Sequence, residues 1–100
     1  MSDGISVLVH RDCLGGERVV ELLLPRGMQL EDLDRLQLDG RREVLDHLPR
    51  PFVRFDVPGH FLLTGIVSDP KVRFTVRLAL RDRAVEIALD ASRKMLGVAV

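Results

Sequence analysis

Hydrophobic and polar residues alternate in two segments near the start of the chain, as expected of β-strands with one buried face. The first segment covers residues 5–11 and the second covers residues 17–24. Gly15 and Gly16 lie between them, and glycine readily adopts the positive φ angles that short hairpin loops need. The pattern therefore predicts an N-terminal β-hairpin with its loop at residues 13–16.

The middle of the chain has a different spacing. Leu30, Leu33 and Leu36 recur every third residue, and acidic residues stand between them, where a helix dipole favours negative charge in the first turns. This spacing predicts a short helix. Residues 41–48 predict a further turn or two of helix, with a hairpin around Asp39-Gly40 as the alternative.

Period-two alternation returns in residues 52–57, 60–67 and 71–80. The turn signals Pro58-Gly59 and Ser68-Asp69-Pro70 separate these segments. We therefore expect a three-stranded antiparallel meander.

The last segment, residues 82–95, carries alanine and isoleucine at helical spacing, with Asp82 as the expected N-cap and Gly97 as the stop. A strand remains the alternative, because Val85, Ile87 and Leu89 also alternate. The whole chain, residues 1–100, is predicted to form a single α+β domain. Its sheet is expected to be mainly antiparallel, with about five strands from the N-terminal hairpin and the meander, and with two or three helices packed on it.

The meander predicts apolar side chains on both faces of its central strand. If Pro58-Gly59 is a two-residue loop, cross-strand partners share a face. One face then carries a possible interface of Val53, Phe55, Leu62 and Ile66. The other face carries Phe61, Leu63, Phe74 and Val76. Helices can cover one face, so the second face needs the N-terminal hairpin, curling of the sheet or a second subunit; a β-bulge that changed the phase would remove this requirement.

Composition narrows the classes of function. The chain has 15 basic and 15 acidic side chains, 46% hydrophobic residues, and no tryptophan or tyrosine. A neutral chain with so few aromatic residues does not favour nucleic acid, and no segment has the roughly 20 apolar residues of a membrane span. The N-terminus lacks the pattern of a secretory signal, so a cytoplasmic location is expected.

Candidate catalytic residues are sparse. Cys13 and His10 are a nucleophile and a base by residue type, but in an extended strand they lie about 10 Å apart along the chain. A lone cysteine also excludes an internal disulfide and a thiolate zinc site. The sequence therefore predicts a non-enzymatic protein without a cofactor or a metal, and a small enzyme using His10 or Cys13 is the weakest alternative.

Arginines gather after residue 72. Arg73 and Arg77 share a face of the predicted third strand, and Arg81 follows them. Arginine's planar fork suits phosphate, so these three residues are candidate anion-binding residues. A solvated strand edge is the competing interpretation.

Two short stretches have counterparts in known families. Residues 21–33, ELLLPRGMQLEDL, resemble the opening of β-grasp sulfur-carrier proteins, whose chemistry requires a C-terminal Gly-Gly where this sequence has Gly97-Val98-Ala99-Val100. Arg50 and Arg54 form an RxxxR that is similar to the first element of PilZ cyclic-dinucleotide domains, but the second element is missing after Asp69. Neither resemblance predicts a family.

The leading functional hypothesis is therefore an accessory or regulatory interaction domain that acts through protein–protein contact as a homodimer. The alternative is a binder of a phosphorylated small molecule or of RNA through Arg73, Arg77 and Arg81.

Overall fold

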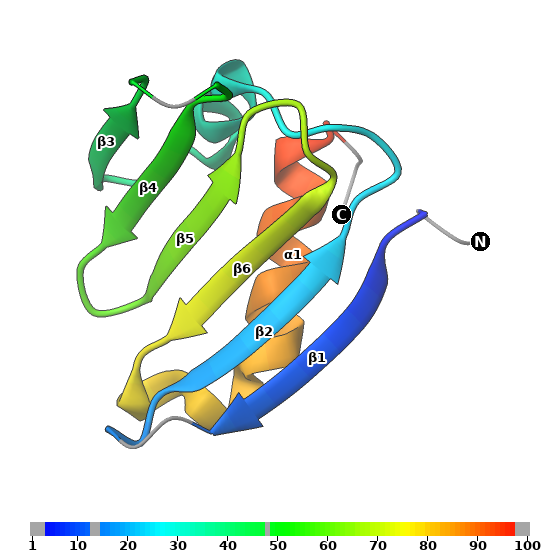
Figure 1. Ribbon diagram of the computed structural model, residues 1–100. Coiled ribbons are helices and arrows are strands. Elements are labelled where there is room, and N and C mark those ends of the chain that lie inside the picture. The colour runs from blue at the N-terminus through cyan, green and yellow to red at the C-terminus, as the bar shows by residue number, and fades with distance from the viewer. Residues whose placement is uncertain (1–3, 13–14, 48, 98–100) are drawn as a thin grey trace.

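The computed structural model describes residues 4–12, 15–47 and 49–97. It shows an α+β fold built on one antiparallel six-stranded sheet, whose strand order is β1-β2-β6-β5-β4-β3 (Figure 1). The strands are β1 (Ser6–Asp12), β2 (Arg18–Leu23), β3 (Arg41–Leu45), β4 (Phe52–Val57), β5 (Phe61–Ile66) and β6 (Lys71–Val76). The helical segments of the described residues are two 3₁₀ helices, η1 (Leu30–Leu36) and η2 (Leu78–Arg83), and the α-helix α1 (Ala84–Met95).

The helical segments α1 and η1 lie on the same side of the sheet, behind it in the view of Figure 1. The strands turn alternate side chains toward this layer, as the period-two pattern predicts. Those side chains form one core with the helices, whose largest members include Phe74, Leu22, Met28, Leu33, Leu36, Leu63 and Met95. The opposite face of the sheet has no described helix on it.

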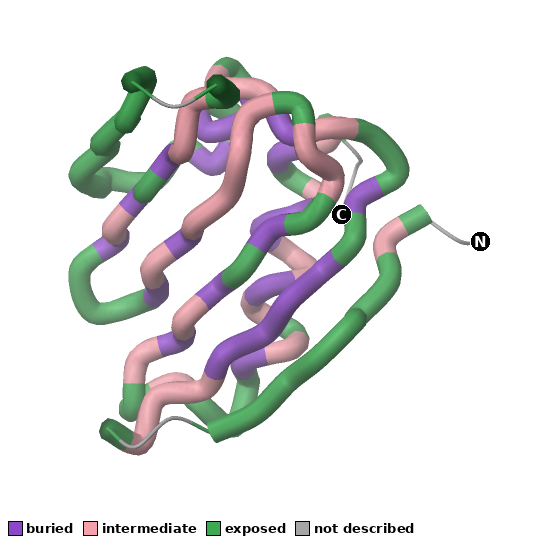
Figure 2. The backbone as a smooth tube through the Cα atoms, in the orientation of Figure 1, coloured by how far each residue is buried: buried purple, intermediate pink, exposed green. Residues whose placement is uncertain are grey.

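The N-terminal hairpin is confirmed, although part of its predicted loop, Cys13 included, lies outside the described residues. β1 forms one edge of the sheet, and all seven of its residues are exposed (Figure 2). The register shifts between Val7 and Val9, which marks a bulge in this edge strand.

The β4–β5 register differs from the one expected for a two-residue loop. Val57 pairs with Phe61, not with His60, so His60 belongs to the loop. The reason is the turn type: the His60 amide bonds to the Val57 carbonyl at 3.0 Å, and Gly59 has a φ of 77°. Pro58 followed by a left-handed glycine is typical of a type II turn, which splays the strands unless the loop is longer than two residues.

This one-residue shift changes which side chains share a face. Val53 and Phe55 now pair with Gly65 and Leu63, and both are buried beneath the helical layer. Leu62 points to the other side of the sheet. The expectation that Val53, Phe55, Leu62 and Ile66 share one face was therefore wrong, because it rested on the shorter loop.

Residues 41–48 were expected to form a further turn or two of helix, but the described part of this segment, residues 41–47, contains no helix. Arg41–Leu45 forms the edge strand β3, which pairs with β4, so the alternative hairpin with residues 36–38 is also wrong. This strand brings the sheet to six strands, where about five were predicted.

The predicted C-terminal helix is confirmed, but what precedes it is different. β6 ends at Val76, and residues 78–83 form η2 where the strand was expected to continue. α1 then starts with Arg83 as its N-cap and without a side-chain capping bond, so the expected Asp82 cap is wrong.

A buried carboxylate joins η1 to its surroundings. The side chain of Asp32 is 1% exposed and accepts two hydrogen bonds from Arg26, at 2.8 and 2.9 Å. It also accepts bonds from the Gln29 amide and from Arg35, and Arg35 in turn donates to the Met95 carbonyl. The network holds η1 against the C-terminal end of α1.

Candidate functional site

The sheet face opposite α1, which we call the open face, is a surface that no described helix covers. Strand register fixes its members, because cross-strand partners share a face. The open face consists of Ser6, Val9 and Arg11 from β1, Val19, Glu21 and Leu23 from β2, Lys71, Arg73 and Thr75 from β6, Leu62, Thr64 and Ile66 from β5, Phe52, Arg54 and Asp56 from β4, and Arg41, Glu43 and Leu45 from β3.

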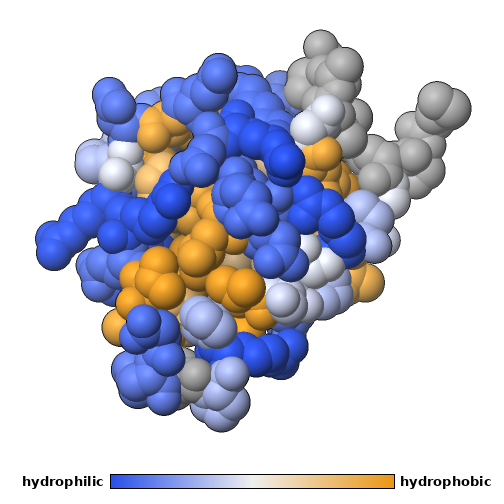
Figure 3. All heavy atoms as spheres, turned by 90° about the horizontal axis from the view of Figure 1, so that it is seen from above, coloured by the Kyte–Doolittle hydropathy of each residue, from blue (hydrophilic) through white to orange (hydrophobic). Residues whose placement is uncertain are grey.

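Apolar side chains gather toward one end of the open face. Leu45 pairs with Phe52 and Phe52 pairs with Ile66, so these three residues are neighbours across three strands. Leu23 stands at the same end, on β2. Figure 3 views the molecule from the end where β5 stops and β6 begins, and shows hydrophobic residues surrounded by hydrophilic ones.

The middle of the open face is charged. Arg54 lies opposite Thr64, which lies opposite Arg73, which lies opposite Glu21. Arg73 donates two hydrogen bonds to one Glu21 oxygen, from Nη2 at 2.7 Å and from Nε at 3.2 Å. Lys71 Nζ lies 3.5 Å from the other oxygen of Glu21. The nearly buried carboxylate of Glu21 therefore contacts two cations, Arg73 and Lys71.

The surroundings of Glu21 favour its ionised form. The hydrogen bond from Arg73 lowers the pKa of Glu21 below its ordinary value; burial opposes this effect, and the charges of Lys71 and Arg73 add to it. Glu21 thus stays negative under ordinary conditions and holds Arg73 in place.

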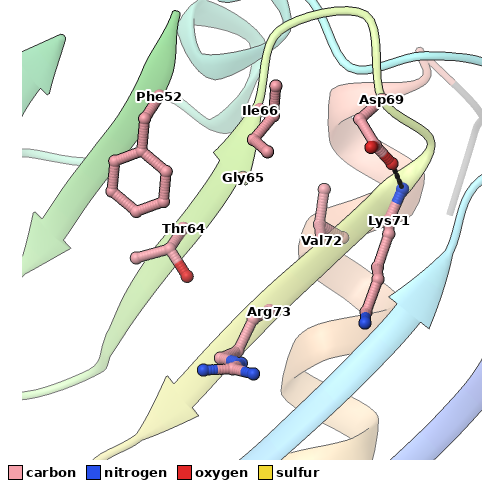
Figure 4. Close-up of a pocket in the computed structure, with 8 residues that line it drawn as sticks. All are labelled: Phe52, Thr64, Gly65, Ile66, Asp69, Lys71, Val72 and Arg73. Carbon is pink, nitrogen blue, oxygen red and sulfur yellow. Dashed lines mark hydrogen bonds between the residues drawn. The ribbon is translucent and has the colours of Figure 1, made fainter. Parts of the chain in front are cut away.

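A shallow hollow of about 370 Å³ opens on this face between β5 and β6, and we call it the β5–β6 hollow. Figure 4 shows that Phe52, Thr64 and Ile66 line one side and that Lys71 and Arg73 project from β6 on the other. Gly65, Asp69 and Val72 complete the lining.

The Asp69 carboxylate, which also lines the hollow, contacts groups other than the side chains of Lys71 and Arg73. It accepts a hydrogen bond from the Lys71 backbone amide at 2.9 Å, and its second oxygen lies 3.6 Å from Arg50. Arg50 compensates its charge, so Asp69 does not cancel the positive charge of Lys71 and Arg73.

The structure does not gather the three predicted anion-binding arginines into one site. Arg77 bonds to Glu17 at 2.9 Å and to Asp56 at 2.6 Å. These contacts raise the pKa of Arg77, the Glu17 bond most of all, and they occupy its guanidinium with two carboxylates. Arg81 lies in η2, past the end of β6, while Arg73 lines the hollow.

The other sequence candidates are dispersed. Leu62 and Ile66 lie on the open face, whereas Val53 and Phe55 are core residues. His10 sits on the exposed edge strand β1. Within residues 4–12, 15–47 and 49–97, no group of histidine, cysteine and carboxylate side chains is placed to hold a metal ion.

Sequence reasoning missed Phe52, Thr64 and Lys71 as neighbours of Arg73. The signal that could have found them is the strand register, which places Thr64 directly opposite Arg73. The turn signal at Ser68-Asp69-Pro70 predicted that Val67 pairs with Val72, whereas the structure pairs Gly65 with Val72.

Comparison with protein-family models, with curated proteins and with solved structures finds no match for this chain. No helix among the described residues is long and apolar enough to span a membrane.

Proposed function

We propose that the protein is a non-enzymatic interaction domain that self-associates by packing the open face of one copy against that of another. The single observation that carries this proposal is the uncovered sheet face with apolar side chains on its central strands. A sheet with one wet face ordinarily places polar residues there, so apolar residues on that face favour contact with a partner.

The apolar part of the open face is substantial. Leu23 is 38% exposed and Leu45 is 43% exposed, and Phe52, Leu62 and Ile66 retain partial exposure between them. Together they make a surface from which a second copy could exclude water.

The charges on the same face suit a copy of the chain as the partner. Arginine and lysine alternate with Glu21, Glu43 and Asp56 across the strands, and the net charge of the chain is zero. Two copies therefore meet without strong repulsion. A nucleic acid would require a surface that is basic throughout.

The size of the face is of the right order. Six strands spaced by about 4.8 Å span roughly 24 Å, and a strand of six residues is roughly 20 Å long, which gives a projected area of about 480 Å². A standard interface buries about 800 Å² of accessible surface on each partner, and the relief of side chains makes accessible area larger than projected area.

Sedimentation velocity from low to high micromolar concentration tests the proposal. The unmodified chain should shift from monomer to dimer, and Leu62→Glu or Ile66→Glu should raise the dissociation constant at least about tenfold, because either variant leaves a carboxylate in an apolar contact.

The matched control is Leu78→Glu, since Leu78 is 57% exposed but lies in η2, away from the open face. Urea unfolding should show that all three variants are folded. A chain that stays monomeric at high micromolar concentration, or a Leu78 variant as impaired as the β5 variants, contradicts the proposal.

A further inference from the structure

The β5–β6 hollow presents hydrogen-bond donors that make no hydrogen bond to any described residue. Arg73 uses Nε and Nη2 on Glu21, and its Nη1 group makes no hydrogen bond to any described residue. Lys71 has three N–H groups and a single carboxylate contact, at 3.5 Å. The Thr64 hydroxyl also has no partner among the described residues. Three donors from two neighbouring strands are thus available at one place.

The charge at the hollow is positive. Lys71 and Arg73 share the single carboxylate of Glu21, while Asp69 is compensated by Arg50. Arg54, opposite Thr64 on β4, forms no ion pair with any described residue. An anion placed beside Thr64 would meet cations on both flanks, although the whole chain is neutral.

The remaining lining is apolar. Phe52 and Ile66 are cross-strand partners on the open face and form one side of the hollow (Figure 4). An aromatic ring beside unfilled cationic donors suits a ligand that joins an anion to a planar or apolar group. The volume of about 370 Å³ falls within the range of small-molecule sites.

We propose that the β5–β6 hollow binds a small organic phosphate, with its phosphoryl oxygens on Lys71, Arg73 and Thr64 and its planar or apolar group on Phe52 and Ile66. Arginine and lysine both bind phosphate, and an arginine pinned by Glu21 loses little side-chain entropy when the ligand arrives. This site does not require self-association, which is a separate property of the open face.

Calorimetric titration of the full chain with inorganic phosphate and with phenyl phosphate tests the site. We expect both to bind, and phenyl phosphate to bind about tenfold more tightly, because burial of about 60 Å² of ring surface corresponds to that factor. Phe52→Ala should remove this preference and leave the affinity for inorganic phosphate nearly unchanged.

The two lysines of the chain provide a matched pair of variants. Lys71→Gln should weaken both ligands about tenfold, since a charge-assisted hydrogen bond is lost, whereas Lys94→Gln on α1 should change neither affinity. Thr64→Val, which keeps the shape of the side chain, should weaken both ligands by a smaller factor.

Two outcomes overturn the inference: neither ligand saturates the protein, or the Lys71 and Lys94 variants lose affinity equally, which would indicate general charge attraction. Light scattering on the same samples reports the oligomeric state separately. A monomer that binds phenyl phosphate would retain this site and refute the self-association proposed above.

Discussion

Asp32 is a buried charged residue, and its carboxylate needs hydrogen-bond donors to replace water. A carboxylate that is 1% exposed loses its hydration, and the fold replaces that hydration with hydrogen bonds from Arg26, Arg35 and the Gln29 amide. Burial pushes the pKa of Asp32 upward, but these bonds and the two arginine charges outweigh it, so the pKa lies below its ordinary value. The ionised form therefore stabilises the fold.

Asp32→Asn should lower the free energy of unfolding by about 2 kcal/mol at neutral pH. The loss corresponds to one or two charge-assisted hydrogen bonds; it stays moderate because Arg26 and Arg35 are 41% and 47% exposed and can return to water. Urea unfolding measures it. Asp34→Asn is the control: Asp34 also pairs with an arginine, Arg42, but is 69% exposed, so its loss should cost below about 1 kcal/mol.

The pH dependence has a defined sign. A carboxylate with a depressed pKa in the folded state contributes stability that is fully present above its unfolded pKa, about 3.9, and that disappears as the pH falls through the folded pKa. The difference in stability between the unmodified chain and Asp32→Asn should be constant down to about pH 5 and shrink below pH 4. A stability difference that does not change with pH would show that the shape of the Asp32 side chain, rather than its charge, stabilises the fold.

Arg73 and Glu21 illustrate what single residues reveal in a sequence. Arg73 was a candidate for anion binding because of its residue type, and it does line the hollow. Its partner Glu21 is 52 positions away in the chain, and nothing in the local pattern connects the two. A pairing across β2 and β6 becomes visible only when the sheet order is known.

At the scale of elements, the strongest patterns predicted the right structures. Leu30, Leu33 and Leu36 repeat every third residue, which is the period of the 3₁₀ helix that forms there. β3 escaped prediction for a physical reason: all five of its residues are exposed, so this edge strand has no buried face to impose alternation. The prediction of which side chains share a face of the sheet was wrong because of one turn. A single extra loop residue exchanges the two faces of a strand.

Gly59 should therefore matter for stability through conformation alone. Its φ is 77°, and a methyl group added there would meet open space. Gly59→Ala should lower the free energy of unfolding by about 1 kcal/mol, the cost of a left-handed alanine. Gly15→Ala is the control, because Gly15 has open space but no positive φ. Equal effects of the two substitutions in urea unfolding would refute the role given to the β4–β5 turn.

At the scale of the whole molecule, one face of the sheet packs against the helices and forms the core, and the other face is exposed and available for contact. Phe74 and Leu63, on one face of the sheet, are buried in one core with Met95 of α1, while the Asp32 network fixes η1 to α1. No described helix covers the open face. Its apolar end and the β5–β6 hollow overlap at Phe52 and Ile66, so the proposed dimer contact and the proposed ligand site draw on the same surface.

This overlap predicts that phenyl phosphate opposes self-association. A ligand that binds the monomer but not the dimer shifts the equilibrium toward the monomer by mass action, and at a ligand concentration of 100 times its dissociation constant each bound site contributes about 2.7 kcal/mol. Sedimentation velocity at a fixed protein concentration should show the dimer fraction falling as phenyl phosphate is added. The same ligand should leave Lys71→Gln largely dimeric, because that variant binds it weakly. A dimer fraction that stays constant while calorimetry shows the ligand bound would place self-association on another surface, with the exposed edge strand β1 as the next surface to test.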